Sequence, residues 1–258
     1  AIADFRQRLL DLTRAVLCDE VASIDSQLGR LDELTRRRQR WLGAPSPNMP
    51  ALARGIQALL ADCEEYGVVP FSVLARYAFM AMSLLRSLRS VGVFSDDEYE
   101  SILSSIPTVA SELSRDMWRH STGRLSTESF LARFGHLRPS SYDITSPNYA
   151  SAQHLLRVGD DKNEPEPPFP DLSVAEELFD AKTKEIDALL RGCGLAVTAR
   201  QLRSFVMRSI PGREWAKFEF MKSVDAALEA IAQFGEGLSF SREEMSFLPV
   251  DAVLRGAL

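Results

Sequence analysis

The sequence predicts an all-α protein folded as a multi-helix bundle. Three observations lead to this expectation. Apolar residues recur at steps of three and four along most of the chain, as they do on the buried face of a helix. Where several such runs begin, a Ser or Thr is followed three residues later by Glu or Gln, the pattern of a helix capping box. No stretch of useful length alternates apolar and polar residues as a half-buried strand would.

Composition places the chain among globular proteins. Hydrophobic residues make up 45% and charged residues 26% of the 258 residues, enough to build a core in one large or two smaller lobes. The formal charge of −6 gives no reason to expect a nucleic-acid partner. The three cysteines are far apart, form no CxxC pair and are accompanied by only three histidines. We therefore expect no disulfide framework, no metal site and a cytoplasmic location.

Neither the N-terminus nor the most apolar stretch of the chain has the pattern of a membrane-inserted segment. The N-terminal residues carry charge from Asp4 onward and contain no signal-peptide core. The most apolar stretch, residues 71–85, is interrupted by Arg76 and is shorter than the roughly 20 residues that span a bilayer. We expect a buried helix there and no membrane partner. The chain begins with Ala1 rather than Met, and we expect it to be a processed or excised piece.

The first expected element is a long N-terminal helix. An apolar stripe begins at Phe5 and shifts by one position at Leu17, and together the two parts predict helix from about residue 4 to residue 41, roughly 57 Å long. The basic run at residues 36–40 has two interpretations. It is a solvated helix end, which the charge pattern favours, or a patch that binds an anion or a nucleic acid.

Further helices are expected in the first lobe. A second helix, residues 50–66, should stop at Gly67, because glycine suits the left-handed position after a helix. Residues 71–91 are apolar on nearly every face, so they should form the most buried helix and stop at the next glycine. Shorter helices are expected to begin at four places: after Ser95, after Pro107, at Ser126 and at Ser146-Pro147.

A proline-rich and charged segment divides the chain. Residues 159–172 are predicted to be a mobile linker between an N-terminal helical lobe, residues 1–158, and a C-terminal helical lobe, residues 173–258. In the second lobe we expect helices to begin at four further places: Ser173, Thr198, Pro211 and Ser241.

The first candidate site lies just after Pro211. Arg213 and Lys217 are four residues apart, so they lie one above the other on one helix face, with Glu214 beside them. Two cations near the unpaired N–H groups of a helix start could hold a phosphate or carboxylate, and the glutamate could accept a proton from a substrate hydroxyl. The alternative is an ordinary surface charge cluster, which spacing alone favours.

The second candidate site is the loop at residues 134–147. Four of its side chains could bind a substrate: His136, Arg138, Tyr142 and Asp143. The alternative is a structural loop whose polar residues cap the neighbouring helices, which loops of this composition often are. The sequence contains no His, Cys and carboxylate cluster with metal-ligand spacing, no glycine-rich phosphate loop and no nucleophile elbow.

Both segments resemble one known family. The loop resembles the FGHLRPGTYDI-x-SP signature of phosphoenolpyruvate-synthase-like proteins, and residues 213–217 resemble their R-E-x-x-K motif. Supporting similarity extends over most of the chain and is specific to the central helical domain of that family, which is related to rifampicin phosphotransferases. One departure is that Ser140-Ser141 replaces the family Gly-Thr, which would strain the loop if that glycine has a positive φ.

The resemblance implies a function. In that family an ATP-grasp domain, where ATP and Mg would bind, precedes this segment, and a phosphohistidine domain follows it. We therefore expect this chain to be the small-molecule acceptor domain of an ATP- or phosphoenolpyruvate-linked phosphotransferase, with those two domains as partners, no cofactor of its own and no activity alone. By the motif, Arg213, Glu214 and Lys217 would be catalytic. The alternative is a helical protein–protein interaction module without catalysis.

Overall fold

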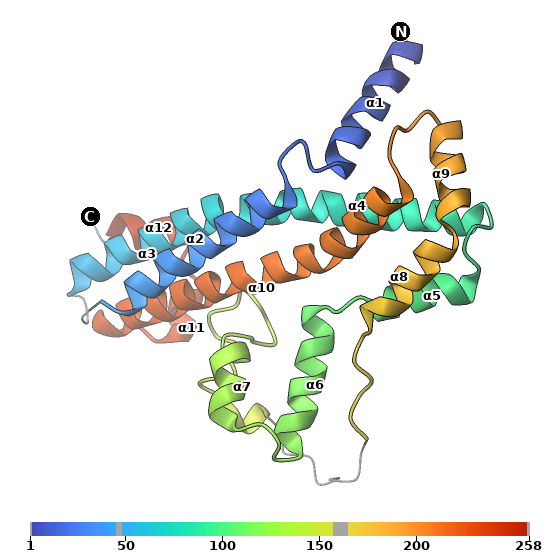
Figure 1. Cartoon of the computed structure of the whole chain (residues 1–258). Coiled ribbons are helices and arrows are strands. Elements are labelled where there is room, and N and C mark those ends of the chain that lie inside the picture. Colours follow the sequence, from blue (N-terminus) through green and yellow to red (C-terminus); the bar gives the residue numbers. More distant parts are fainter. Residues whose placement is uncertain (1, 45–47, 157–164, 257–258) are drawn as a thin grey trace. The chain divides into compact units, whose positions relative to one another are not determined.

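The computed structural model describes residues 2–44, 48–156 and 165–256. Every regular element in these ranges is a helix, and they contain no strand (Figure 1). The all-α prediction is confirmed. The bounds of the elements, in chain order, are as follows: α1 Ile2–Leu17, α2 Ile24–Leu42, α3 Met49–Cys63, the π-helix η1 Glu64–Val68, α4 Val69–Ser90, α5 Asp96–Ser105, α6 Val109–Ser121, α7 Thr127–Phe134, the 3₁₀ helix η2 Gln153–Leu155, α8 Leu172–Ala181, α9 Thr183–Gly192, α10 Ala199–Gly237, α11 Arg242–Ser246 and α12 Val250–Gly256.

The chain forms two compact units, and each is assembled from three segments. Unit 1 consists of Ala1–Gly29, Pro70–Glu112 and Pro168–Ala216, and unit 2 consists of Arg30–Val69, Leu113–Pro167 and Lys217–Leu258. This division differs from the expected lobes 1–158 and 173–258, because both units take residues from each side of the linker. Of that linker, residues 159–164 lie outside the described residues, and residues 165–171 contain no helix.

Each unit has its own apolar core. In unit 1, Phe94 and Phe179 of α8 meet edge to face with ring centroids 5.2 Å apart, and α5 packs along α8. In unit 2 one cluster joins residues of α3, α10, α11 and α12. Its members include Leu52, Ala53, Ile56, Ile144, Ala230, Ile231, Phe234, Met245 and Val253.

The expected single N-terminal helix is two helices. Residues 18–23 separate α1 from α2, and two of them, Asp19 and Ala22, have positive φ. Asp19 accepts a hydrogen bond from the N–H of Ile24, and the Tyr77 hydroxyl donates to the carbonyls of residues 21 and 22. The break falls where the apolar stripe changes phase by one position. That shift was a sign of two helices and not of one.

The expected stop at Gly67 is also wrong. Helix continues without interruption from Met49 to Ser90, with η1 as a π-helical segment inside it. A Cβ atom at Gly67 would lie 2.7 Å from Phe220 Cβ and 3.0 Å from Leu34 Cδ2. The glycine therefore permits close packing within unit 2 instead of ending a helix.

This continuous helix, Met49–Ser90, meets the length and composition required to cross a membrane, and 33% of its most apolar window is buried. Core helices of soluble proteins meet the same criterion, so the criterion assigns no location.

The helix at residues 71–91 was expected to be the most buried helix of the chain, and this is wrong. Seven residues of α4 are buried, but Phe79 is 61% exposed and Arg76, Arg86 and Arg89 form a polar side.

Helix α10, which is 39 residues long, contains Pro211, where a new helix was expected to start. The helix runs through Pro211 without a break, although proline removes one backbone hydrogen bond inside a helix. The expected helix from Ser173 is divided into α8 and α9 at Lys182, and Asp171 caps α8 in place of Ser173. No α-helix begins at Ser146-Pro147, because Ser146 lies in a bend and Pro147 has no regular structure.

Several helix starts and stops were predicted correctly. Both reciprocal bonds of a capping box are present at Ser95 with Glu98 and at Ser241 with Glu244. Ser126 caps α7. Gly92, just after α4, has φ +81°, in the left-handed region. These are local features, and local sequence is sufficient to specify them.

Candidate functional site

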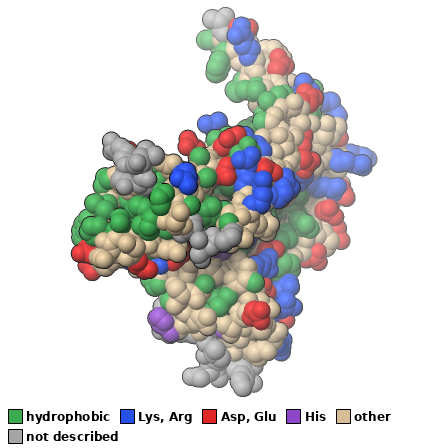
Figure 2. All heavy atoms as spheres, turned by 90° about the vertical axis from the view of Figure 1, so that its left-hand side faces the viewer, with side chains coloured by type: hydrophobic (Ala, Val, Ile, Leu, Met, Phe, Trp, Pro, Cys, Tyr) green, Lys and Arg blue, Asp and Glu red, His purple; other side chains and the backbone are tan. Residues whose placement is uncertain are grey.

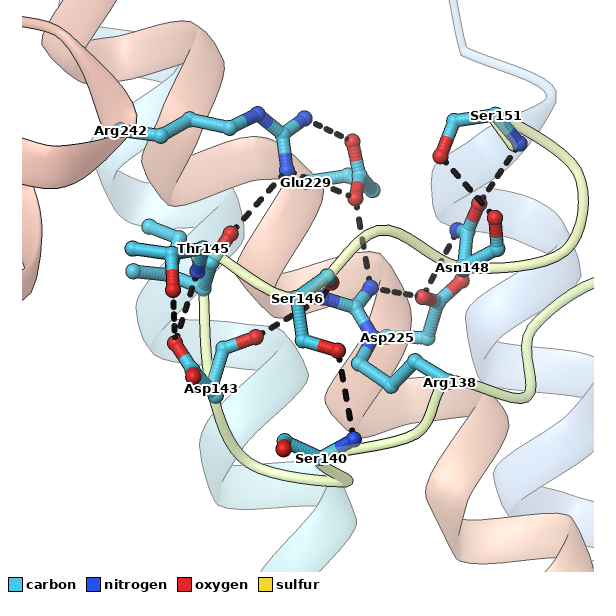
Figure 3. A network of polar contacts seen from close by, with 11 residues as sticks. Arg138, Ser140, Asp143, Thr145, Ser146, Asn148, Ser151, Asp225, Glu229 and Arg242 are labelled. Carbon is cyan, nitrogen blue, oxygen red and sulfur yellow. Dashed lines mark hydrogen bonds and ion pairs between the residues drawn. The ribbon is translucent and has the colours of Figure 1, made fainter. Parts of the chain in front are cut away.

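The loop after α7 is held in place by one buried arginine. Arg138, whose side chain is 1% exposed, donates from Nη1 to the carbonyls of Asp143 and Ser146, at 3.3 and 3.0 Å. Its Nη2 binds the carboxylates of Asp225 and Glu229, which are one turn apart on α10 (Figure 3). One guanidinium therefore fixes both the shape of the loop and its position against α10 within unit 2.

A second set of contacts surrounds this arginine. Arg242 of α11 binds Glu229 through both terminal nitrogens and donates to the carbonyl of Ile144 at 3.4 Å. Asn148 donates to Asp225 at 2.9 Å and accepts from the N–H of Ser151 at 2.8 Å (Figure 3). Two carboxylates and two guanidinium groups thus alternate in one network, which balances the charge that is removed from water.

The two carboxylates of the network respond differently to this environment. Burial raises the pKa of Asp225, against the opposing effects of Asn148 and Arg138. For Glu229 burial also acts to raise the pKa, but the bonds from Arg242 and Arg138 outweigh it and the pKa is lowered. Glu229 is therefore the firmly ionised member of the pair.

A cavity of about 560 Å³ lies beside this network in unit 2. Its walls come from α2, from α7 with the following loop, and from one face of α10. It is lined by Thr35, Arg38, Gln39, Trp41, Leu42, Leu131, Ala132, His136, Lys222, Asp225, Ala226, Glu229, Ala230 and Gln233. The α10 residues recur every three or four positions, twice as adjacent pairs, so they form one stripe that is charged at Lys222, Asp225 and Glu229.

One buried carboxylate connects two cations of the cavity wall. Glu219 accepts from Lys222 Nζ at 2.5 Å and from Arg38 Nη2 at 3.4 Å. Arg38 is 6% exposed and also donates to the hydroxyls of Thr35 and Ser223.

The basic run at residues 36–40 was expected to be a solvated helix end, and this holds for all of its arginines except Arg38. Three of its arginines pair with Glu33 near the surface, whereas Arg38 is buried. Acidic and basic side chains are interspersed on the face shown in Figure 2.

His136 is the residue of the predicted loop that lines the cavity. Its ring meets Phe218 of α10 edge to face at 4.7 Å between centroids. Burial, together with the charges of Lys222 and Arg38, lowers its pKa to about 3, so the imidazole is neutral at pH 7. Its Nε2 atom is buried and has no hydrogen-bond partner among the described residues.

The other predicted loop residues have different positions. Arg138 holds the loop from within. Asp143 is exposed and accepts from the N–H and the hydroxyl of Thr145, which lowers its pKa. Tyr142 is 65% exposed and, with Asp143, lines a smaller cavity of about 230 Å³ in unit 2. Ser140 and Ser141 have no positive φ, so the serine pair adopts its conformation without backbone strain.

The residues of the R-E-x-x-K segment do not line the 560 Å³ cavity. Arg213 and Lys217 are exposed, and Glu214 is half-buried. The guanidinium of Arg213 lies over the ring of Phe79, 5.4 Å from its centroid. Because α10 passes through Pro211, this segment is in the middle of a helix, and the expected anion seat at a helix start is absent there. The predicted meeting of all three residues with the loop in one cleft stays a prediction.

Four charged residues of the cavity were missed from the sequence: Arg38, Lys222, Asp225 and Glu229. The last three carried a signal, because they follow one another at steps of three and four residues along one helix. Arg38 carried none, since nothing local distinguishes it from its arginine neighbours. Among the residues that the structure describes, no group of three or more His, Cys, Asp or Glu side chains could hold a metal ion.

Comparisons with known protein families, with curated proteins and with solved structures find no significant match to this chain. The resemblance to phosphoenolpyruvate-synthase-like proteins therefore stays a prediction.

Proposed function

We propose that unit 2 binds a small molecule and serves as the acceptor-binding part of a phosphotransferase that works through a phosphohistidine domain. The observation that carries the binding proposal is the cavity of about 560 Å³. Small-molecule sites typically have volumes of roughly 300–1,000 Å³, with apolar walls and a few fixed polar groups. Here the apolar part includes Trp41 and Leu131, and the polar part is the stripe on α10.

The polar groups are held in fixed positions, which supports binding over a chance hollow. Asp225 and Glu229 are oriented by Arg138 and Arg242, and Lys222 is oriented by Glu219. A site whose side chains are already ordered loses less conformational entropy when a ligand binds. The carboxylates suit hydroxyl or amine donors of a ligand, and the lysine suits an acceptor or an anion.

The transfer step of this proposal rests on the sequence resemblance. The acceptor hydroxyl would form a bond to phosphorus while the bond between phosphorus and the donor histidine breaks. Arg213 and Lys217 would stabilise charge on the phosphoryl group, and Glu214 would take the hydroxyl proton. Lys217 lies five residues before Lys222, about 7.5 Å along the helix and about 140° around it. The role of Lys217 in transfer therefore rests on the motif alone.

A matched pair of substitutions tests the binding proposal. Gln233 and Glu236 are both exposed on α10, but only Gln233 lines the cavity. A panel of hydroxylated small molecules would first be screened by the rise in melting temperature, and the dissociation constant of the best ligand would then be measured by calorimetry. Gln233→Trp should weaken binding at least tenfold, while Glu236→Trp should leave it unchanged. Equal dissociation constants for the two variants would refute the cavity as the site.

A further inference from the structure

Helix α1 of unit 1 carries an apolar stripe that this unit does not cover. The exposed fractions are 87% for Ile2, 68% for Phe5, 53% for Leu9 and 57% for Leu12. Figure 1 shows α1 as the helix that ends at N, and Figure 2 shows hydrophobic side chains along the helix at the top. The stripe ends at Val16, which is 8% exposed and packs inside the unit.

The spacing of the stripe is that of a coiled-coil seam. Steps of three, four, three and four residues assign the stripe to the a and d positions of two heptads. The seam is narrow, because the next apolar residue, Leu10, is half-buried and faces Gly194 within unit 1. A stripe of two residues in seven matches a partner helix, whereas a helix that lies on a membrane has a broader apolar face.

The charge beside the seam indicates what kind of helix fits. With Ile2 at a, the flanking e and g positions are occupied by Arg6, Arg8, Thr13 and Ala15. No flanking position carries a carboxylate. The acids of this helix, Asp4 and Asp11, are on its outer side, where they bind Arg8 and Gln7. The Arg8–Asp4 pair is exposed on both sides, so it can exchange partners at little cost.

A groove of about 710 Å³ beside the seam is also positively charged. It is formed by α1 and the end of α9, and its lining includes Arg6 and Arg191 but no acidic residue. The protein has a net charge of −6, yet three arginines gather here: Arg6 and Arg8 beside the apolar seam, and Arg191 in the adjoining groove. This local excess of positive charge indicates selection of an acidic partner.

A second copy of the chain fits this surface poorly. In an antiparallel pair, the layers Ile2 with Leu12 and Phe5 with Leu9 match, but they place Arg8 opposite Arg8 and Arg6 opposite Arg6. In a parallel pair, Arg8 faces the uncharged Thr13. Neither arrangement gives a complementary charge pair, and the first gives repulsion.

From these observations we propose that the α1 seam is a docking site for an amphipathic helix of another protein, one that carries Glu or Asp beside its apolar stripe. The seam supplies the apolar contact, and Arg6, Arg8 and Arg191 select the partner by charge. This inference does not depend on the proposed small-molecule site in unit 2.

The test uses the full 258-residue chain and two labelled synthetic peptides of about four heptads. Both peptides have Leu and Ile at the seam, but one has Glu and the other Lys at every flanking position. Fluorescence anisotropy at low salt should give at least tenfold tighter binding of the acidic peptide. The double variant Arg6→Glu, Arg8→Glu should reverse this preference. Leu9→Asn should abolish binding, and Asp11→Asn, on the outer side, should retain it.

Several outcomes would overturn the proposal. Equal binding of both peptides would mean unspecific apolar adhesion, and no binding of either would remove the docking site. A dimer in sedimentation equilibrium that Leu9→Asn dissociates would assign the seam to a second copy. Binding to vesicles that contain phosphatidylserine, lost in Leu9→Asn while the acidic peptide fails to bind, would assign it to a membrane.

Discussion

At the scale of single residues, unit 2 depends most on Arg138. Its side chain is 1% exposed and satisfies two carbonyl oxygens and two carboxylates. The loop sequence suggested a substrate contact for this residue, but its contacts are structural. The reason for the difference is that its carboxylate partners are on α10, about 90 residues later in the chain. Local sequence does not contain that information.

Arg138→Ala should lower the free energy of unfolding by about 3–5 kcal/mol, because it leaves the carboxylate of Asp225 without its counter-charge and the loop carbonyls without their donor. Urea denaturation followed by circular dichroism measures the change. The control is Arg8→Ala, whose ion pair with Asp4 is exposed and should contribute less than about 0.5 kcal/mol. A loss below about 1 kcal/mol at Arg138 would mean that the network does not hold the loop.

His136 should make stability depend on pH. Its pKa falls from the ordinary 6.5 to about 3 in the folded protein, so the unfolded chain binds a proton more readily. Stability is therefore complete above pH 6.5 and falls as the pH is lowered toward 3, by an amount on the order of a few kcal/mol. His136→Asn should flatten the dependence of unfolding free energy on pH between 6.5 and 4. An unchanged slope would show that this imidazole is not buried in its neutral form.

At the scale of elements, the helix class and many caps followed from the sequence, and the helix lengths did not. A capping box involves two residues that are three positions apart, so the helix starts at Ser95 and Ser241 could be predicted from local sequence. The roles of the glycines could not be predicted in the same way. Gly92 follows the end of a helix and has a positive φ, whereas Gly67 lies inside a helix and leaves room for Phe220 and Leu34 to pack closely. A glycine has the same letter in both roles, and only the packed structure separates them.

Two glycine substitutions should therefore have opposite signs. Gly67→Ala should destabilise the protein by about 1–3 kcal/mol, since the new methyl group would lie 2.7 Å from Phe220 Cβ. Gly29→Ala, inside α2, meets no atom within 4 Å and should stabilise by about 0.5–1 kcal/mol through helix propensity. Chemical denaturation of both variants gives the comparison. Equal signs would contradict the close approach at Gly67.

At the scale of the whole molecule, the sequence indicated two parts, and the two compact units divide the chain differently. Proline and charge mark residues 159–172, and a linear division followed from them. The units instead combine three segments each, because helices α2, α4 and α10 continue across the boundaries between them. The cavity residues were also predicted only in part. His136 was selected from the loop, but Arg38 and Lys222 are far from it in the sequence, and the fold brings them to the same cavity.

The central claim is that the unit 2 cavity binds a small molecule, and the three tryptophan indoles of the chain test it most directly. Trp41 lines the cavity, whereas Trp118 and Trp215 do not. The ¹⁵N-indole NMR spectrum should be recorded while the best ligand of the thermal screen is added. The Trp41 resonance should shift with saturation, and the other two resonances should stay in place. A bound ligand that leaves Trp41 unmoved, or that moves only Trp118 or Trp215, would contradict it.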